Sequence, residues 1–159
     1  ASICFATAEV SIAVVWDAAD TDNKSKRKNQ SMHYTDKVME HFMCPQNVGY
    51  MPDSDAVGEW GDPSCGDALI MYIKVKNNRI YEISYQVFGC CAAIATSSMT
   101  SVLAKGATLE EAEKITDQDI ANALEGLPEA KMHCSNMGAS ALRAAIRNYR
   151  FLNKVGDKK

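Results

Sequence analysis

Three cysteines, one aspartate and one histidine in this chain carry side chains that could bind a metal. Cys65 and Asp67 lie in one loop between two glycines, and Cys90 follows a Phe-Gly dipeptide. Cys134 lies far along the chain, directly after His133. Thiolate sulfur, imidazole nitrogen and carboxylate oxygen are the donors found in protein zinc sites and iron–sulfur clusters. A lone cysteine is often a small apolar core residue, so the prediction of a metal or cluster site depends on the whole set.

A β-hairpin is predicted between the first two cysteines. Leu69 to Val75 alternates in polarity with the period of a strand, and Asn77-Asn78 tolerates the positive φ angles of a tight turn. On the return strand the alternation places four apolar residues on one face: Tyr81, Ile83, Tyr85 and Val87. Val57 to Trp60 adds a third strand. One apolar face of this sheet must be covered.

Helices are expected to cover that face. The first begins at Tyr34 with Thr35 as its cap, and an Ala-rich helix spans 91–105. Short helices open at the capping residues Thr108 and Thr116, and the last helix runs over 133–152. The fold class is therefore α+β, with a small antiparallel sheet of about three strands and helices packed on one face.

These elements bring the cysteines together. A hairpin joins its outer ends, so Cys65 and Cys90 should be neighbours. Cys90 and Cys134 both begin helices, where the unpaired amides and the helix dipole lower the pKa of a thiol. Lys131 and His133 add positive charge beside Cys134. Three thiolates at one end of a sheet favour a soft metal over core packing.

Composition limits the function classes. The 159 residues carry a net charge of −3, with 47% hydrophobic and 23% charged residues, which does not suggest a nucleic-acid partner. No apolar run reaches the roughly 18 residues of a membrane helix. Six cysteines without a secretory signal or regular spacing are typical of a reduced, cytoplasmic protein. Redox Cys-x-x-Cys pairs, phosphate loops and nucleophile elbows are absent from the sequence, so no enzyme class is indicated.

Three regions are expected along the chain. Residues 1–31 differ in composition and are interpreted as an extension or leader that is either foreign or packed on the domain. The domain itself spans 32–154, and 155–159 form a C-terminal tail. Cationic residues recur along the last predicted helix, where they form either a solvated stripe or a docking surface for an acidic partner: Arg143, Arg147, Arg150 and Lys154.

From Tyr34 to Tyr149 the chain resembles the IscU/NifU-type iron–sulfur cluster scaffolds. The segment Pro45 to Gly49 resembles that family's Pro-x-Asn-x-Gly turn. Gly61 to Asp67, Phe88 to Ile94 and Lys131 to Ser135 resemble its three cysteine motifs, in order and at fitting spacing. Related Suf-type scaffolds carry an insertion between the second and third cysteines that is missing here.

The resemblance implies the fold, ligands and partners of that family. The implied fold is IscU/SufE-like, and the implied cargo is a [2Fe–2S] cluster built from iron and from sulfur supplied by a cysteine desulfurase of the IscS/NifS type. Cys65, Cys90 and Cys134 would be ligands, with Asp67 as the nearby carboxylate and His133 as an alternative ligand. Cys134 is the candidate persulfide acceptor. Apo iron–sulfur proteins would receive the cluster, and a ferredoxin or a frataxin-like protein could assist.

Two departures from the family bear on partners. The segment recognised by an Hsp70-type chaperone reads Leu-Pro-Pro-Val-Lys in many members, and here Glu129 interrupts it, which argues against dependence on that chaperone. Cys91 is an additional thiol, expected to pack within its helix. The alternatives to a cluster scaffold are a zinc-dependent, SufU-like sulfurtransferase and a structural zinc module, and the purified protein could carry zinc in either case.

Overall fold

The computed structural model describes residues 33–62 and 66–156. The expectations for residues 1–31 and for Cys65 lie outside these ranges. No helix in the described part of the chain is long and apolar enough to cross a membrane.

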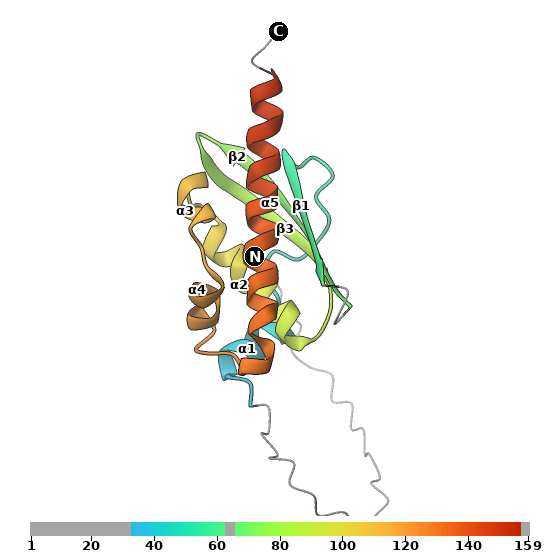
Figure 1. Ribbon diagram of the computed structural model, residues 1–159, viewed down its shortest axis with the longest axis vertical. Coiled ribbons are helices and arrows are strands. Elements are labelled where there is room, and N and C mark those ends of the chain that lie inside the picture. The colour runs from blue at the N-terminus through green and yellow to red at the C-terminus, as the bar shows by residue number, and fades with distance from the viewer. Residues whose placement is uncertain (1–32, 63–65, 157–159) are drawn as a thin grey trace, which may run out of the picture. The chain divides into compact units, whose positions relative to one another are not determined.

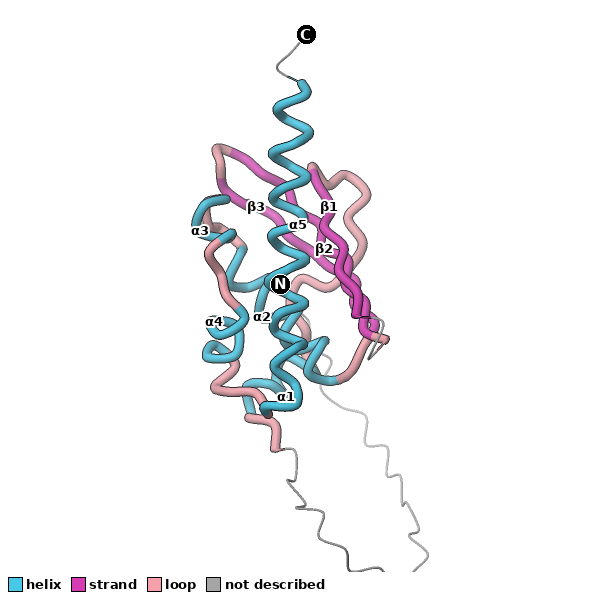
Figure 2. Tube along the Cα trace, viewed as in Figure 1, coloured by secondary structure: helices cyan, strands magenta, loops and turns pink. Residues whose placement is uncertain are grey.

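A three-stranded antiparallel sheet forms one layer of the structure (Figures 1 and 2). Its strands are β1 (Ala56–Asp62), β2 (Asp67–Lys76) and β3 (Arg79–Phe88), and β2 is the central strand. Asn77 and Asn78 form the hairpin turn with φ angles of 53° and 60°, in the left-handed region that asparagine tolerates better than most residues. The predicted hairpin and third strand are therefore confirmed.

One face assignment on β3 is wrong. Lys74 pairs with Glu82, but the next residue, Val75, pairs with Ile80, so Tyr81 is the extra residue of a β-bulge. A bulge shifts the alternation of side chains by one position. Ile80 is consequently fully buried, whereas Tyr81 is 50% exposed and does not join Ile83 in the core.

The helices follow the predicted order. They are α1 (Asp36–Met43), α2 (Cys91–Ala104), α3 (Leu109–Glu113), α4 (Asp117–Ala123) and α5 (Met132–Gly156), with a 3₁₀ turn, η1 (Glu129–Lys131), before α5. The side chain of Thr35 caps α1, and Thr108 and Thr116 form capping boxes on α3 and α4. The last helix is longer than the 133–152 predicted, because the sequence lacks a stop signal until Gly156.

Helix α5 crosses the same sheet face that α2 covers (Figure 1). It packs on β1 and β2, while α2 packs on β3. The closest approach is at Gly58, which is buried: a β-carbon there would overlap the carbonyl oxygen of Ala141 and the backbone of Ala145. Because Gly58 has no side chain, the backbone of α5 can lie directly on β1.

The far end of α5 is tied to the rest of the fold by arginines. Arg143 donates hydrogen bonds to the carbonyl oxygens of Glu113 and Ile115, and Arg150 pairs with the Glu113 carboxylate at 2.7 Å. Arg147 and Lys154 are exposed. Only part of the predicted basic stripe is therefore solvated.

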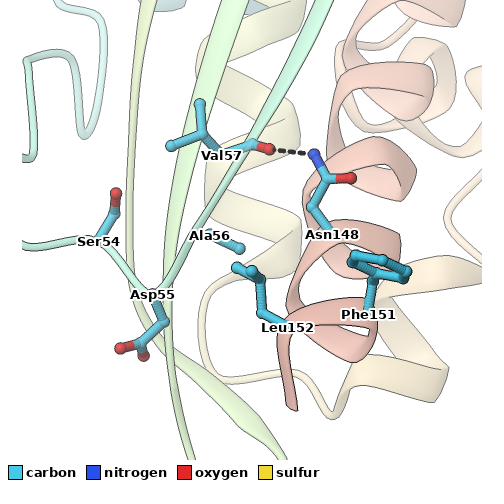
Figure 3. A pocket seen from close by; sticks show the side chains of 7 residues that line it. All are labelled: Ser54, Asp55, Ala56, Val57, Asn148, Phe151 and Leu152. Carbon is cyan, nitrogen blue, oxygen red and sulfur yellow. Dashed lines mark hydrogen bonds between the residues drawn. The ribbon is translucent and has the colours of Figure 1, made fainter. Parts of the chain in front are cut away.

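A shallow groove of about 450 Å³ lies between the start of β1 and the side chains of Phe151 and Leu152, near the C-terminal end of α5 (Figure 3).

Helix α2 is buried along most of its length, and its polar residues form bonds inside the protein. The hydroxyls of Thr96, Ser97 and Thr100 bond to backbone carbonyls of the same helix. The Ser98 hydroxyl lies 2.8 Å from Nδ1 of His41, which is only 6% exposed. His41 is therefore a packing residue of the α1–α2 interface.

We expect a single added methyl group at Gly58 to destabilise the fold. The new β-carbon in Gly58→Ala would meet backbone atoms of α5, which cannot rotate away as a side chain can. The free energy of unfolding should fall by about 3 kcal/mol, near the upper end of typical overpacking effects. Urea denaturation measures this change. Gly61→Ala is the matched control on the same strand, because its nearest contact would be an ordinary 3.6 Å. If both variants lower the free energy of unfolding equally, the close approach of α5 to Gly58 is contradicted.

Stability should also fall as the pH drops below about 6.5, the pKa of an unfolded histidine. Burial, and secondarily the charge of Lys37, lower the pKa of His41 in the folded protein. The unfolded chain therefore binds a proton that the folded chain does not, with a slope of at most about 1.4 kcal/mol per pH unit. Urea denaturation between pH 7 and 5 should show this slope in the parent and lose it in His41→Gln. His33→Gln, at an exposed histidine, should keep the slope. If the slope is lost in His33→Gln and kept in His41→Gln, His41 is not the group responsible.

Candidate metal and cluster centre

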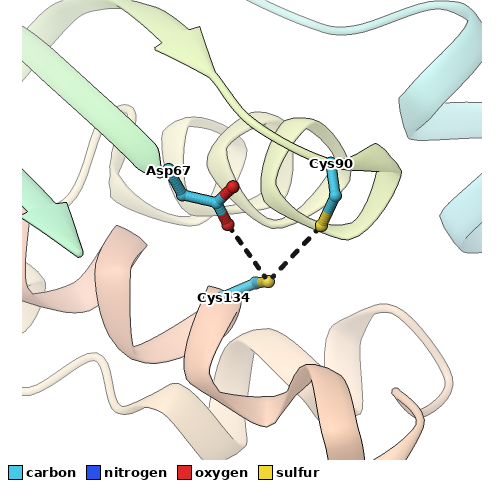
Figure 4. Close-up of side chains that lie close together, drawn as sticks. All are labelled: Asp67, Cys90 and Cys134. Carbon is cyan, nitrogen blue, oxygen red and sulfur yellow. Dashed lines mark hydrogen bonds between the residues drawn. The ribbon is translucent and has the colours of Figure 1, made fainter. Parts of the chain in front are cut away.

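Asp67, Cys90 and Cys134 come from three different elements and meet at one end of the sheet (Figure 4). Asp67 is the first residue of β2, and Cys90 is the N-cap of α2, two residues after the end of β3. Cys134 lies in the first turn of α5. The hairpin joins the first two, and the packing of α5 across the sheet brings the third to them.

The distances among the three residues suit a shared metal. The Cys134 sulfur lies 3.8 Å from the Cys90 sulfur and 3.8 Å from Oδ2 of Asp67. All three donor atoms lie within 4.8 Å of one another. Two thiolates on one tetrahedral zinc are about 3.8 Å apart, since each Zn–S bond is about 2.3 Å. The separation of the two sulfurs therefore fits a shared metal.

Burial makes this group of donors unfavourable without a cation. Cys134 is fully buried and Asp67 is 7% exposed, whereas Cys90 is only partly buried. Burial first, and then the charge of Cys90, raise the pKa of the Cys134 thiol far above its ordinary value. This corrects the expectation of a lowered pKa, because desolvation outweighs the helix dipole. A bound metal would reverse the balance by replacing the proton.

Lys131 supplies a positive charge on the open side of the group. Its Nζ lies 3.8 Å from the Cys90 sulfur, and the charge of Cys90 raises the pKa of Lys131. Lys131 ends the 3₁₀ turn η1, and its charge acts on Cys134 as expected. Its ammonium group also lies against Cys90, where it can offset the negative charge of a thiolate or a cluster.

His133 is near the group but outside its centre. Its Nε2 lies 3.4 Å from the Cys134 sulfur, and the residue is exposed. It is not one of the three residues whose donors share a 4.8 Å neighbourhood. His133 could therefore join a metal only by extending the group towards solvent.

Tyr34 is a neighbour that the sequence did not indicate. It packs against the buried residues between the sheet and α5, and against a second buried group that includes Val38 and Ala95. Burial raises the pKa of its phenol. The charges of Lys131 and of the site thiols also act on it, which places it close to the group. Its position just before the N-cap Thr35 gave no signal of this role.

The remaining predicted residues divide into two sets. Cys65 lies outside the described residues, so its proximity to Cys90 stays a prediction. Cys91 packs against the buried group around Ala95, and burial raises the pKa of its thiol. Within residues 33–62 and 66–156, Asp67, Cys90 and Cys134 are the group of histidine, cysteine and acidic side chains found close enough to share a metal.

Zinc binding should depend on Cys90 and Cys134 and not on Cys91. Cys134→Ala and Cys90→Ala each remove a sulfur from the 3.8 Å pair, and each should lose most of the roughly one zinc per chain expected of preformed thiolate ligands. Cys91→Ala is the matched control, since it removes a neighbouring thiol outside the group. Elemental analysis after dialysis against zinc gives the answer. Full zinc content in Cys134→Ala would place the metal elsewhere.

Comparison with known proteins gives one family. Residues 33–155 match the NifU-like N terminal domain. The chain is 58% identical over 125 residues to the iron-sulfur cluster assembly scaffold protein IscU 1 of Archaeoglobus fulgidus, covering 79% of this chain and 82% of that protein. It is 42% identical over 123 residues to IscU of Azotobacter vinelandii, covering 75% of this chain and 95% of that one.

Two further similarities extend the comparison. The nitrogen fixation protein NifU of Trichormus azollae is 51% identical over 125 residues, which make up 74% of this chain and 42% of that longer protein. The crystal structure of a NifU-like protein (N-terminal) from Brucella abortus superposes with a TM-score of 0.51 at 17% identity, covering 79% of this chain and 95% of that one. The structural likeness concerns the fold, whereas the family match and the sequence identities decide membership: this chain belongs to the NifU-like N-terminal domain family.

Proposed function

We propose that this chain is a scaffold on which [2Fe–2S] clusters are assembled and from which they are passed to apo-proteins. The observation that carries the proposal is the meeting of Cys90, Cys134 and Asp67 within 4.8 Å at one end of the sheet. Soft sulfur donors beside one hard oxygen donor suit iron–sulfur chemistry. The names of the IscU relatives at 58% and 42% identity agree with this function.

The proposed ligands are the two thiols of the described group and Cys65. Three thiolates leave one position of a [2Fe–2S] cluster for a different donor, since each iron takes two protein ligands in addition to the bridging sulfides. Asp67 is the first candidate because its carboxylate oxygen already lies 3.8 Å from the Cys134 sulfur. His133 is the alternative, 3.4 Å from the same sulfur but exposed.

A carboxylate in this position would make the cluster easy to release. Oxygen is a harder donor than thiolate and binds iron of a cluster more weakly. Water or a thiol of the recipient protein could replace the carboxylate on one iron, which would begin the release of the cluster. A donor protein needs such a weak point, whereas a protein that keeps its cluster for electron transfer is better served by four thiolates.

Iron and sulfur must be brought to the site by other proteins. A cysteine desulfurase is the proposed sulfur source, and Cys134 is the proposed acceptor of the persulfide. Because Cys134 is fully buried, its sulfur can accept only after the site opens, whereas Cys90 is already partly exposed. The chain would act as a carrier in this reaction rather than as an enzyme, and we place it in the cytoplasm.

A zinc-dependent sulfurtransferase is the second candidate. The 3.8 Å separation of the two sulfurs suits a single zinc ion as well as it suits a cluster. Incubation without oxygen with ferrous iron and sulfide separates the two functions, because a [2Fe–2S] protein absorbs visible light and a zinc protein does not. A colourless protein that accepts sulfur from a desulfurase while it holds zinc would favour the second function.

Cluster assembly should require Cys90 and Cys134 and tolerate the loss of Cys91. Cys90→Ser and Cys134→Ser each replace a soft donor of the group by a hydroxyl, which binds iron poorly. Both should lose most of the visible absorbance after reconstitution, while Cys91→Ser keeps it. Circular dichroism checks that each variant is folded. A folded Cys90→Ser protein with the full signal would contradict the ligand assignment.

Replacement of Asp67 by alanine should lengthen the life of the cluster in air. Removal of the oxygen donor removes the proposed weak point, so Asp67→Ala should also transfer its cluster more slowly to an apo-ferredoxin. Decay of the visible absorbance under air and the rate of ferredoxin loading measure the two effects. If a folded Asp67→Ala protein instead loses its cluster faster than the parent, the carboxylate stabilises the cluster and the proposed role is wrong.

A further inference from the structure

The carboxylate of Asp67 fits into the site only because the residue before Cys90 is a glycine. A β-carbon built on Gly89 would lie 2.8 Å from Oδ1 and 2.9 Å from Cγ of Asp67. These separations are shorter than carbon atoms normally tolerate. One oxygen of the carboxylate is thus against Gly89, while the other faces Cys134 at 3.8 Å.

The opposite wall of this space cannot move aside. The same β-carbon would lie 2.8 Å from the side chain of Ala93, which is fully buried in the first turn of α2. The carbonyl oxygen of Ala93 accepts hydrogen bonds from the hydroxyls of Thr96 and Ser97, so this turn is held from within. The turn of α2 is packed and cannot move, whereas the Asp67 side chain can rotate about two bonds. A methyl group on residue 89 would therefore displace the Asp67 side chain.

We propose that Gly89 is a positioning residue that sets how readily the site releases its cluster. A carboxylate is planar and rigid, so displacement of Oδ1 by a methyl group also displaces Oδ2 from the donor group. Gly89→Ala would leave both thiols in place and remove the oxygen donor, without altering Asp67 itself. The effect on cluster release rests on the proposed function. The effect of residue 89 on the position of the Asp67 carboxylate can be tested with a bound metal alone.

The test uses Gly89→Ala, Asp67→Ala and the double variant, each also combined with Ala93→Gly. The Ala93→Gly change removes the second contact, so that the new methyl group meets only Asp67. Two measurements are made on each variant of the 159-residue chain. The first is binding of cobalt(II), whose charge-transfer bands report thiolate ligands and whose affinity reports the whole donor set. The second is the lifetime of the reconstituted cluster in air.

If Gly89 acts through Asp67, Gly89→Ala should behave like Asp67→Ala. Cobalt affinity should fall by about threefold or more, towards the lower end of couplings between residues in contact. The charge-transfer bands should keep their intensity, because both thiolates remain. Cluster lifetime should lengthen by a similar factor. In the Asp67→Ala, Ala93→Gly background, Gly89→Ala should change neither quantity.

Several results would overturn the inference. One is unchanged cobalt affinity in Gly89→Ala. Another is loss of charge-transfer intensity, which would show that the methyl group displaces Cys90 instead. A third is an effect of Gly89→Ala that persists at full size without Asp67. Failure of the parent protein to form any cluster would refute the proposed function, and the cobalt measurements would still decide the role of Gly89.

Discussion

The contact of α5 with β1 at Gly58 determines the geometry of the site. A side chain at this position would push the helix away from the sheet. Cys134 lies two helical turns before Ala141, or about 10 Å along α5, and Asp67 lies at the start of the strand that pairs with β1. A second close approach, of Gly138 to Thr100, sets the distance between α5 and α2 and hence between Cys134 and Cys90. We infer that the dimensions of the site follow from the packing of α5 on β1 and α2 at these two glycines.

This packing forces two thiols and a carboxylate into a largely buried space. Burial, and then the charge of Cys90, raise the pKa of the Cys134 thiol, which favours its neutral form in this space. Lys131 offsets negative charge at Cys90, on the less buried side. A metal or cluster relieves the same electrostatic cost more completely. In the proposed function this group would bind a cation, and an oxygen donor beside the thiolates would make the ligand shell weaker than the all-thiolate shell of a permanent cofactor.

Much of this could be predicted from the sequence, and the remainder could not for identifiable reasons. Alternation of residues and the Asn77-Asn78 turn gave the hairpin, and capping residues gave the helix starts, because these signals are local. The bulge at Tyr81 has no such signal, since it depends on the pairing of Ile80 with Val75 across the turn. The pKa of Cys134 was predicted in the wrong direction because burial is a tertiary property. The proposed role of Gly89 depends on Asp67, which is distant in the sequence. Tyr34 likewise lies near the site only because the fold brings distant segments together.

The central claim is that thiolates and one oxygen donor share the bound cluster. X-ray absorption at the iron edge measures this most directly on the reconstituted full-length protein. We expect a first shell of sulfur with a contribution from a shorter iron–oxygen or iron–nitrogen bond, and that contribution should change in Asp67→Ala. A first shell made of sulfur alone at both irons in the parent protein would contradict it.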